Sequence, residues 1–88
     1  MNEVEISYTS KFVKNYKRLD ANIRSKAKQR IEVFQIDPYN PVLKTHKLTG
    51  QLNKFCSFSI NYSYRILFAF ENSNQVTFID VGTHSIYR

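Results

Sequence analysis

The sequence has little of what usually cross-links or interrupts a fold. Among its 88 residues it contains one cysteine, two glycines, two prolines and no tryptophan. The single cysteine excludes an intrachain disulfide and a thiolate-rich zinc site, which fits a reducing compartment such as the cytoplasm. Cys56 lies among Phe55 and Phe58 and is expected to pack as a small hydrophobic residue, not to act as a nucleophile. So little glycine and proline leaves no linker material, and we expect one domain over residues 1–88.

Long hydrophobic runs are also missing. The longest apolar run, residues 66–70, is much shorter than the about 20 residues that a membrane-spanning helix needs. The amino terminus has neither the basic stretch nor the apolar stretch of a secretory signal. We therefore expect a cytoplasmic protein that has no membrane partner.

Aromatic and basic residues are what the sequence does contain. Hydrophobic residues make up 42% and aromatic residues 15%, as in a packed globule and unlike a disordered tail. Twelve of the thirteen Lys and Arg residues lie between Lys11 and Arg65, where only three acidic residues oppose them, so that segment has a net charge of +9. This concentration predicts a polyanionic partner, either nucleic acid or an acidic protein segment. The alternative is a basic surface that serves only solubility.

Hydrophobic periodicity predicts a short strand followed by two helices. Residues 4–8 alternate apolar and polar side chains, as a half-buried strand does. Thr9 or Ser10 suits a helix N-cap, and Asp20 suits a second one. The second helix is expected to end at Asp37-Pro38, because a residue before proline disfavours the helical conformation. The apolar positions are Phe12, Tyr16 and Leu19 in the first helix and Ile23, Ala27, Ile31 and Phe34 in the second.

The last third of the chain predicts a strand meander. Residues 38–54 show no periodicity and are expected to be irregular. Residues 55–60, 64–70 and 75–81 are rich in β-forming side chains and are separated by polar turn residues. The predicted fold class is therefore α+β in the order β-α-α-β-β-β, with a helical hairpin packed on a mainly antiparallel four-stranded sheet.

Strand alternation separates one arginine from the core. Within residues 64–70 the even positions carry the phenylalanines and mark the core face, so Arg65 is expected on the opposite face. An antiparallel turn after this strand sets Arg65 near Val81, three positions before His84. Both side chains are long enough to cover that gap, and we expect Arg65 and His84 to approach each other.

Metal-independent RNA cleavage needs side chains of these kinds. A base removes the proton from the 2′-hydroxyl, a cation stabilises the pentavalent phosphate, and an acid protonates the leaving 5′-oxygen. Arg65 would supply a fixed positive charge, and His84 a group that exchanges protons near neutral pH. Simpler explanations stay open: Arg65 as a salt-bridge partner of Glu71 or Asp80, and His84 as an ordinary surface residue.

Three blocks follow one another in the second half of the chain. They are His46-Lys47-Leu48-Thr49-Gly50, Tyr64-Arg65-Ile66-Leu67-Phe68 and Asp80-Val81-Gly82-Thr83-His84-Ser85-Ile86-Tyr87. In this order the blocks resemble the RelE/ParE toxin superfamily, and within it the ribosome-dependent messenger RNA nucleases of the RelE, YoeB and YafQ type. The strand and helical hairpin before them also suit the family, so the resemblance spans nearly the whole chain.

The resemblance implies roles for individual residues. Arg65 matches a phosphate-stabilising arginine, His84 a proposed general acid or base, and Tyr87 an aromatic residue that stacks on a base or orients the phosphate. His46 matches a catalytic loop histidine of YafQ-like members, whereas members of the RelE branch use lysines in that region, so Lys44, Lys47 and Lys54 are candidates too. The YoeB-like branch has a glutamate base in this loop, but residues 42–54 contain no acid, so the base is His46 or stays undetermined. Candidates for binding RNA are Lys44, Lys47 and Lys54 in the loop and Arg24 and Lys28 in the second helix, and Arg88 follows Tyr87 in the tail.

The implied function is that of the toxin in a type II toxin–antitoxin system. Such a protein cleaves messenger RNA on the ribosome without a metal or cofactor, and a cognate antitoxin neutralises it. Two alternatives stay open: a ParE-like inhibitor of DNA gyrase, and a catalytically inactive homologue that only binds the antitoxin. The Gly82-Thr83-His84 block is more typical of the nuclease branch.

Overall fold

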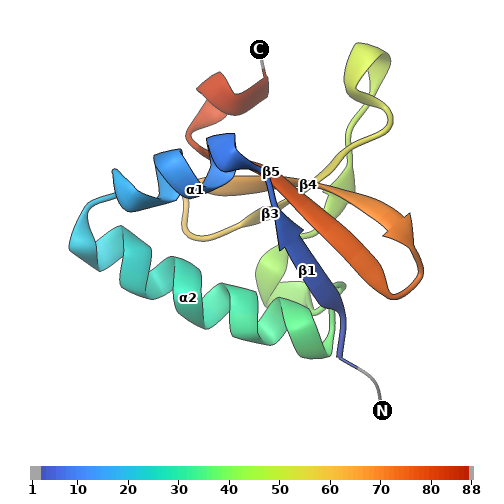
Figure 1. Ribbon diagram of the computed structural model, residues 1–88, viewed down its shortest axis with the longest axis horizontal. Helices are drawn as coiled ribbons and strands as arrows, with labels where there is room; N and C mark the ends of the chain where they lie inside the picture. The colour runs from blue at the N-terminus through green and yellow to red at the C-terminus, as the bar shows by residue number, and fades with distance from the viewer. Residues whose placement is uncertain (1–2, 88) are drawn as a thin grey trace.

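A computed structural model describes residues 3–87 and has two helices and a five-stranded sheet (Figure 1). The helices are α1 (Ser10–Lys17) and α2 (Ala21–Ile36). The strands are β1 (Glu5–Tyr8), β2 (His46–Lys47), β3 (Cys56–Ser59), β4 (Arg65–Asn72) and β5 (Gln75–Gly82). Three short 3₁₀ helices complete the chain: η1 (Pro41–Leu43), η2 (Gly50–Leu52) and η3 (His84–Tyr87). The α+β class and the order of the main elements are confirmed.

Both helices begin at the predicted caps. The side chain of Thr9 accepts a hydrogen bond from the amide of Phe12 at 3.0 Å, and the carboxylate of Asp20 accepts one from the amide of Asn22 at 3.1 Å. These bonds satisfy amides that the first helical turn leaves free. The second helix ends at Asp37, before Pro38, as predicted. Within residues 3–87 neither helix has the length and apolar character needed to cross a bilayer.

The sheet has one strand more than the sequence predicts. Its order is β1-β5-β4-β3-β2, with β1 parallel to β5 and every other pair antiparallel. The additional strand is β2, whose His46 and Lys47 pair with Ser57 and Cys56 of β3. The prediction that residues 38–54 are wholly irregular is wrong at this point. A strand of two residues is too short to show alternation, and only its neighbour in the sheet defines it.

The predicted register of the β4–β5 hairpin is correct from Phe68 to Phe70 and wrong by one residue from Arg65 to Leu67. Arg65 pairs with Gly82, not with Val81. The cause is a register shift between Leu67 and Phe68, where Ile79 is left out of the ladder. Such a bulge adds a residue to one strand, and the side-chain pattern of the sequence does not predict it. The expected faces are nevertheless preserved, since Arg65 still lies opposite the core face.

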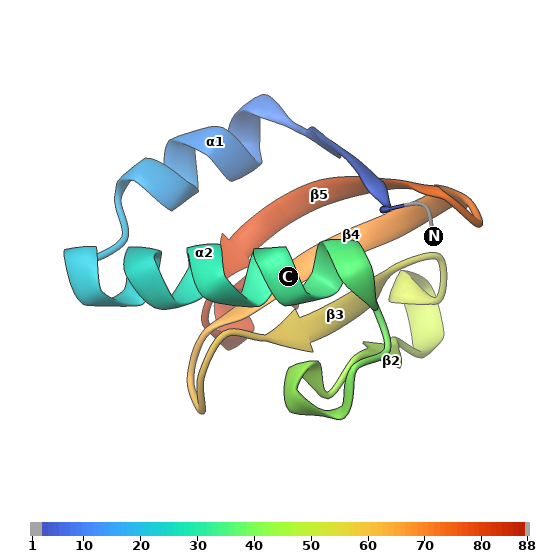
Figure 2. The same cartoon turned by 90° about the horizontal axis from the view of Figure 1, so that it is seen from below.

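The core lies between α2 and the sheet (Figure 2). Phe34 of α2 is fully buried, and its ring lies 4.8 Å from Phe58, 4.9 Å from Phe68 and 5.4 Å from Phe78, centroid to centroid. These three rings come from β3, β4 and β5, so one helical side chain packs against the three central strands. The opposite face is partly covered as well, because Leu67 is buried there and β4 contacts η3.

Candidate functional site

The four residues predicted as catalytic gather on the sheet face that α2 leaves open. Ser57 and Ser59 are two apart in β3, so both point to the face opposite Phe58. Ser57 pairs with His46 of β2, and Ser59 pairs with Arg65 of β4. Cross-strand partners share a face, so the sheet itself brings His46 and Arg65 to one surface. Neither serine is predicted as a site residue from the sequence, although their alternation with Phe58 marks them as polar positions on the non-core face.

Arg65 lines two cavities, one shared with His84 and one that extends toward α2. A cavity of about 310 Å³ is lined by Arg65, His84 and Tyr62, and another of about 400 Å³ by Arg65, Tyr62 and Lys44 among others. The predicted approach of Arg65 and His84 thus corresponds to a shared cavity. Arg65 is half-buried, and its Nη1 donates a hydrogen bond to Oγ of Ser59.

No carboxylate neutralises Arg65 within residues 3–87. The one ion pair in that range joins Lys11 Nζ to Asp80 Oδ2 at 3.5 Å. The other oxygen of Asp80 accepts a hydrogen bond from Asn15 at 2.7 Å, and Glu71 accepts one from Thr77 at 2.8 Å. The alternative explanation of Arg65 as a salt-bridge partner of Asp80 or Glu71 is therefore wrong. Among residues 3–87 its guanidinium therefore has no anionic partner, and a guanidinium in that state suits the binding of an external anion such as a phosphate.

A chain of hydrogen-bonding groups connects Tyr87 to His46. The hydroxyl of Tyr87 donates to Oγ of Ser57 at 3.0 Å, and the same Oγ lies 3.5 Å from Nε2 of His46. On its other side, His46 Nδ1 lies 3.1 Å from the carbonyl oxygen of Lys44. A carbonyl only accepts, so Nδ1 must donate, and in the neutral ring Nε2 then carries the lone pair. In this tautomer Nε2 lies beside the Ser57 hydroxyl as a hydrogen-bond acceptor.

Tyr87 also contacts His84. The two rings lie 5.8 Å apart, centroid to centroid, with an interplanar angle of 70°. Because the Tyr87 hydroxyl reaches Ser57, a single side chain bridges the region of His84 and that of His46. The four residues predicted as catalytic, namely Arg65, His84, His46 and Tyr87, thus share one face. Arg88 lies outside the described residues.

Gly82 determines how η3 packs on the sheet. A Cβ atom added at Gly82 would lie 2.9 Å from Cγ2 of Ile86, a buried residue of η3. The glycine therefore permits the close approach of η3, which carries His84 and Tyr87 to the open face.

Replacing Gly82 by alanine is expected to displace η3 and to separate Tyr87 from Ser57. Overpacking of this kind costs about 1–3 kcal/mol of unfolding free energy. Urea denaturation measures that cost, and NMR spectra of the Tyr87 ring report the displacement. Thr83→Ala, at an exposed neighbouring position, is the control. If Gly82→Ala is as stable as the parent and leaves the Tyr87 resonances unchanged, the proposed packing role of Gly82 is wrong.

The predicted RNA-binding residues fall into separate groups. Lys44 lines a cavity with Arg65. Lys47 pairs with Cys56, and with Lys54 and His46 it lines a cavity at the β2 edge of the sheet. Arg24 and Lys28 lie on α2, away from the open face, and Nη1 of Arg24 donates to the carbonyl oxygen of Leu19 at 2.9 Å.

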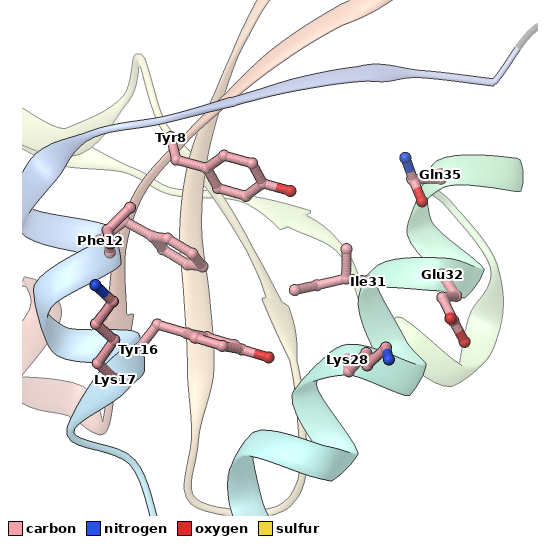
Figure 3. Close-up of a pocket in the computed structure, with 9 residues that line it drawn as sticks. Tyr8, Phe12, Tyr16, Lys17, Lys28, Ile31, Glu32 and Gln35 are labelled. Carbon is pink, nitrogen blue, oxygen red and sulfur yellow. The ribbon is translucent and has the colours of Figure 1, made fainter.

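Lys28 borders an apolar groove between α1 and α2 (Figure 3). Tyr8, Phe12 and Tyr16 point from β1 and α1 toward Ile31 of α2 in this groove. Burial raises the pKa of the Tyr8 hydroxyl, and the neighbouring Tyr16 raises it further. The groove contains none of the four residues predicted as catalytic, so it is separate from the candidate site.

Cys56 is half-buried, and burial raises the pKa of its thiol, with nearby Lys47 acting in the opposite direction. A raised pKa keeps the thiol protonated at neutral pH, which favours the predicted packing role over that of a nucleophile.

Comparison with solved structures finds the same fold in toxins of toxin–antitoxin systems. A YoeB/ParE toxin from Agrobacterium tumefaciens is 19% identical, with 92% of this chain and 99% of that chain covered and a TM-score of 0.76. YafQ from Escherichia coli is 18% identical, with 97% and 98% covered and a TM-score of 0.74. The YoeB–YefM toxin–antitoxin complex from Staphylococcus aureus matches at 18% identity, with 92% and 97% covered and a TM-score of 0.74. No family model and no curated protein sequence matches. The expected RelE/ParE-type fold is confirmed.

Proposed function

We propose that this chain, which has the RelE/ParE fold, is the toxin of a type II toxin–antitoxin system and cleaves messenger RNA on the ribosome. The observation that carries the proposal is the grouping of Arg65, His84, His46 and Tyr87 on one open face, with no carboxylate paired to Arg65 within residues 3–87. Two histidines beside a guanidinium that has no ion pair among residues 3–87 are more typical of a catalytic site than of a surface that only binds a partner.

The proposed chemistry assigns one task to each group. His46 Nε2 takes the proton from a 2′-hydroxyl, and the resulting oxygen attacks the adjacent phosphorus. Arg65 stabilises the charge that develops on the pentavalent phosphate. His84 gives a proton to the departing 5′-oxygen, so that a 2′,3′-cyclic phosphate and a 5′-hydroxyl are formed. Tyr87 positions both histidines, since its ring contacts His84 and its hydroxyl holds Ser57 beside His46.

The proposed partner is an acidic antitoxin. The Staphylococcus aureus YoeB was solved in complex with the YefM antitoxin, and DinJ was solved with YafQ of Escherichia coli. In the present chain α1 and α2 together contain seven Lys and Arg residues and one acidic residue, Glu32, so these helices carry the +6 that the whole sequence carries. An acidic, flexible segment of an antitoxin is complementary to such a surface. We place this activity in the cytoplasm, where messenger RNA is translated.

Replacing the 2′-hydroxyl at the cleaved nucleotide by hydrogen is expected to abolish cleavage, because the attacking oxygen is then missing. Purified protein and ribosomes programmed with messenger RNA provide the assay, and primer extension locates the new 5′ ends. The cyclic phosphate is detected by its resistance to phosphatase until acid opens it. Cleavage that persists in the deoxy substrate would contradict this mechanism.

Expression in a host separates the nuclease from the gyrase inhibitor. New 5′ ends within codons, together with growth arrest, support the nuclease. Accumulation of gyrase–DNA cleavage complexes with intact messenger RNA would support the ParE-like alternative. A chain that causes no growth defect without its antitoxin would be an inactive homologue.

A further inference from the structure

One large aromatic side chain outside the candidate site is exposed and held in place. Tyr39, just after α2, is 64% exposed, and its ring stacks on Phe70 of β4 at 6.1 Å between centroids and 17° between planes. Phe70 in turn lies edge-on to Phe68, which is fully buried, at 5.4 Å. Tyr39 therefore continues a series of aromatic rings that starts in the core, and its outer side is open to solvent.

The loop that carries Tyr39 is fixed by local hydrogen bonds. Oδ1 of Asp37 accepts from the amide of Tyr39 at 3.1 Å, and the carbonyl oxygen of Asp37 accepts from the amide of Asn40 at 3.0 Å. The hydroxyl of Thr45 donates to the carbonyl oxygen of Pro38. A ring on a fixed loop loses little conformational entropy when it binds a flat ligand.

Two lysines share a cavity with this ring. Tyr39 and Phe70 line a cavity of about 870 Å³ together with Lys47, Lys54 and His46, and no acidic residue lines it. His46 also belongs to the open face, where its Nε2 lies 3.5 Å from Oγ of Ser57. Lys47 and Phe70 belong to the other face of the sheet, so the cavity meets the candidate site around the β2 edge, at His46, to which we assign the proton transfer from the 2′-hydroxyl.

We propose that this cavity binds a nucleotide of single-stranded RNA next to the cleaved one. Its base stacks on the outer side of Tyr39, and its phosphates lie against Lys47 and Lys54. Flat aromatic rings and cations are the two elements by which proteins hold single-stranded nucleic acid without reading its sequence. An acidic peptide would pair with Lys47 and Lys54 but would gain less than a base does from stacking on the exposed side of the Tyr39 ring. The inference rests on the proposed function for its ligand, and its test does not depend on cleavage.

The test is binding of a fluorescein-labelled RNA of about eight nucleotides, a length within the range that single OB-fold domains bind. Its 2′-hydroxyls are methylated to prevent cleavage, and anisotropy gives the affinity. Tyr39→Ala is expected to weaken binding about 5- to 100-fold, whereas Tyr39→Phe, which keeps the stacking face, changes it less than about twofold. The slope of affinity against salt should stay the same in Tyr39→Ala and fall by about one in Lys54→Ala.

Ile36→Ala is the matched control, because Ile36 is equally exposed at the end of α2 and lines none of the described cavities around Tyr39 or Arg65. An RNA that lacks a single base should lose affinity for the parent at one position and show no such loss with Tyr39→Ala. This second measurement tests base stacking in the parent protein itself, so it remains decisive even if Tyr39→Ala is less stable.

Three results would overturn the proposal: unchanged binding by Tyr39→Ala, an equal loss in Ile36→Ala, or a polyglutamate peptide that binds with the same dependence on Tyr39. Failure of the proposed function gives a different pattern. RNA binding that depends on Tyr39, in a protein that cleaves no RNA, would keep the subsite and exclude the nuclease. If the protein cleaves RNA and neither cleavage nor binding depends on Tyr39, the nuclease proposal stands and the subsite is excluded.

Discussion

Replacing Arg65 by alanine is expected to lower the rate of RNA cleavage by about 10²–10³-fold, the usual effect of removing one donor to the transition state. Arg65 is the fixed cation of the open face, and it lines the cavity that it shares with His84 as well as the one that it shares with Lys44. The phosphate gains charge as the 2′-oxygen attacks, so the loss falls on the rate of the chemical step more than on binding. Single-turnover cleavage of ribosome-bound messenger RNA measures this rate.

The fold should survive the change. Arg65 is half-buried, and within residues 3–87 it forms no ion pair, so the variant loses mainly one hydrogen bond to Ser59. Circular dichroism and urea denaturation check this. Arg18→Ala, which removes an exposed cation at the end of α1, is the charge-matched control and should cleave at the parent rate.

Arg65→Lys adds a test of geometry. Lysine keeps the charge but loses the planar fork of donors that suits a phosphate, so an intermediate rate is expected. If Arg65→Ala and His84→Ala both arrest growth as fully as the parent chain, the nuclease proposal fails.

Replacing Phe34 by alanine is expected to lower the free energy of unfolding by about 3–5 kcal/mol. Phe34 is fully buried, and its ring packs on Phe58, Phe68 and Phe78 from three adjacent strands. A domain of this size has a total stability of only about 5–15 kcal/mol, so the variant should be close to unfolded at growth temperature. Urea denaturation followed by circular dichroism gives the value.

Ile36→Ala serves as the control two positions along the same helix. Its side chain is 64% exposed, so the change should alter stability by less than about 0.5 kcal/mol. A loss below about 1 kcal/mol in Phe34→Ala would mean that the cavity it leaves is refilled by its neighbours, and the central role of this ring would be wrong.

The helix ends and the strand faces are predictable because each depends on residues that lie close together in the sequence. Thr9 and Asp20 cap helices by bonds to amides two or three residues away, and Pro38 ends a helix by a clash with its own neighbour. Alternation along residues 64–70 places Arg65 on the non-core face in any antiparallel register that keeps Phe68 buried. The α+β class follows from these elements.

The site is only partly predictable for the same reason. Arg65 could be assigned from alternation and block order, and His84 and His46 from the resemblance. Ser57 could not be assigned, since a serine in a strand gives no sign of its cross-strand neighbours. Ser57 joins the candidate site through its cross-strand pairing with His46 of β2. Strand β2 itself forms because the backbone groups of His46 and Lys47 pair with those of β3.

The sequence alone thus determined the caps, the periodic elements, the basic charge and the face of Arg65, because each depends on residues within a few positions of one another. Only the tertiary structure decided the parallel pairing of β1 with β5, the bulge at Ile79 that sets Arg65 opposite Gly82, and the path from Tyr87 through Ser57 to His46. The β1–β5 pairing and the path from Tyr87 to His46 join segments that are distant in the sequence, and the bulge depends on Ile79, which has no partner in the ladder. Backbone pairing and close packing select such contacts, and local side-chain pattern does not encode them.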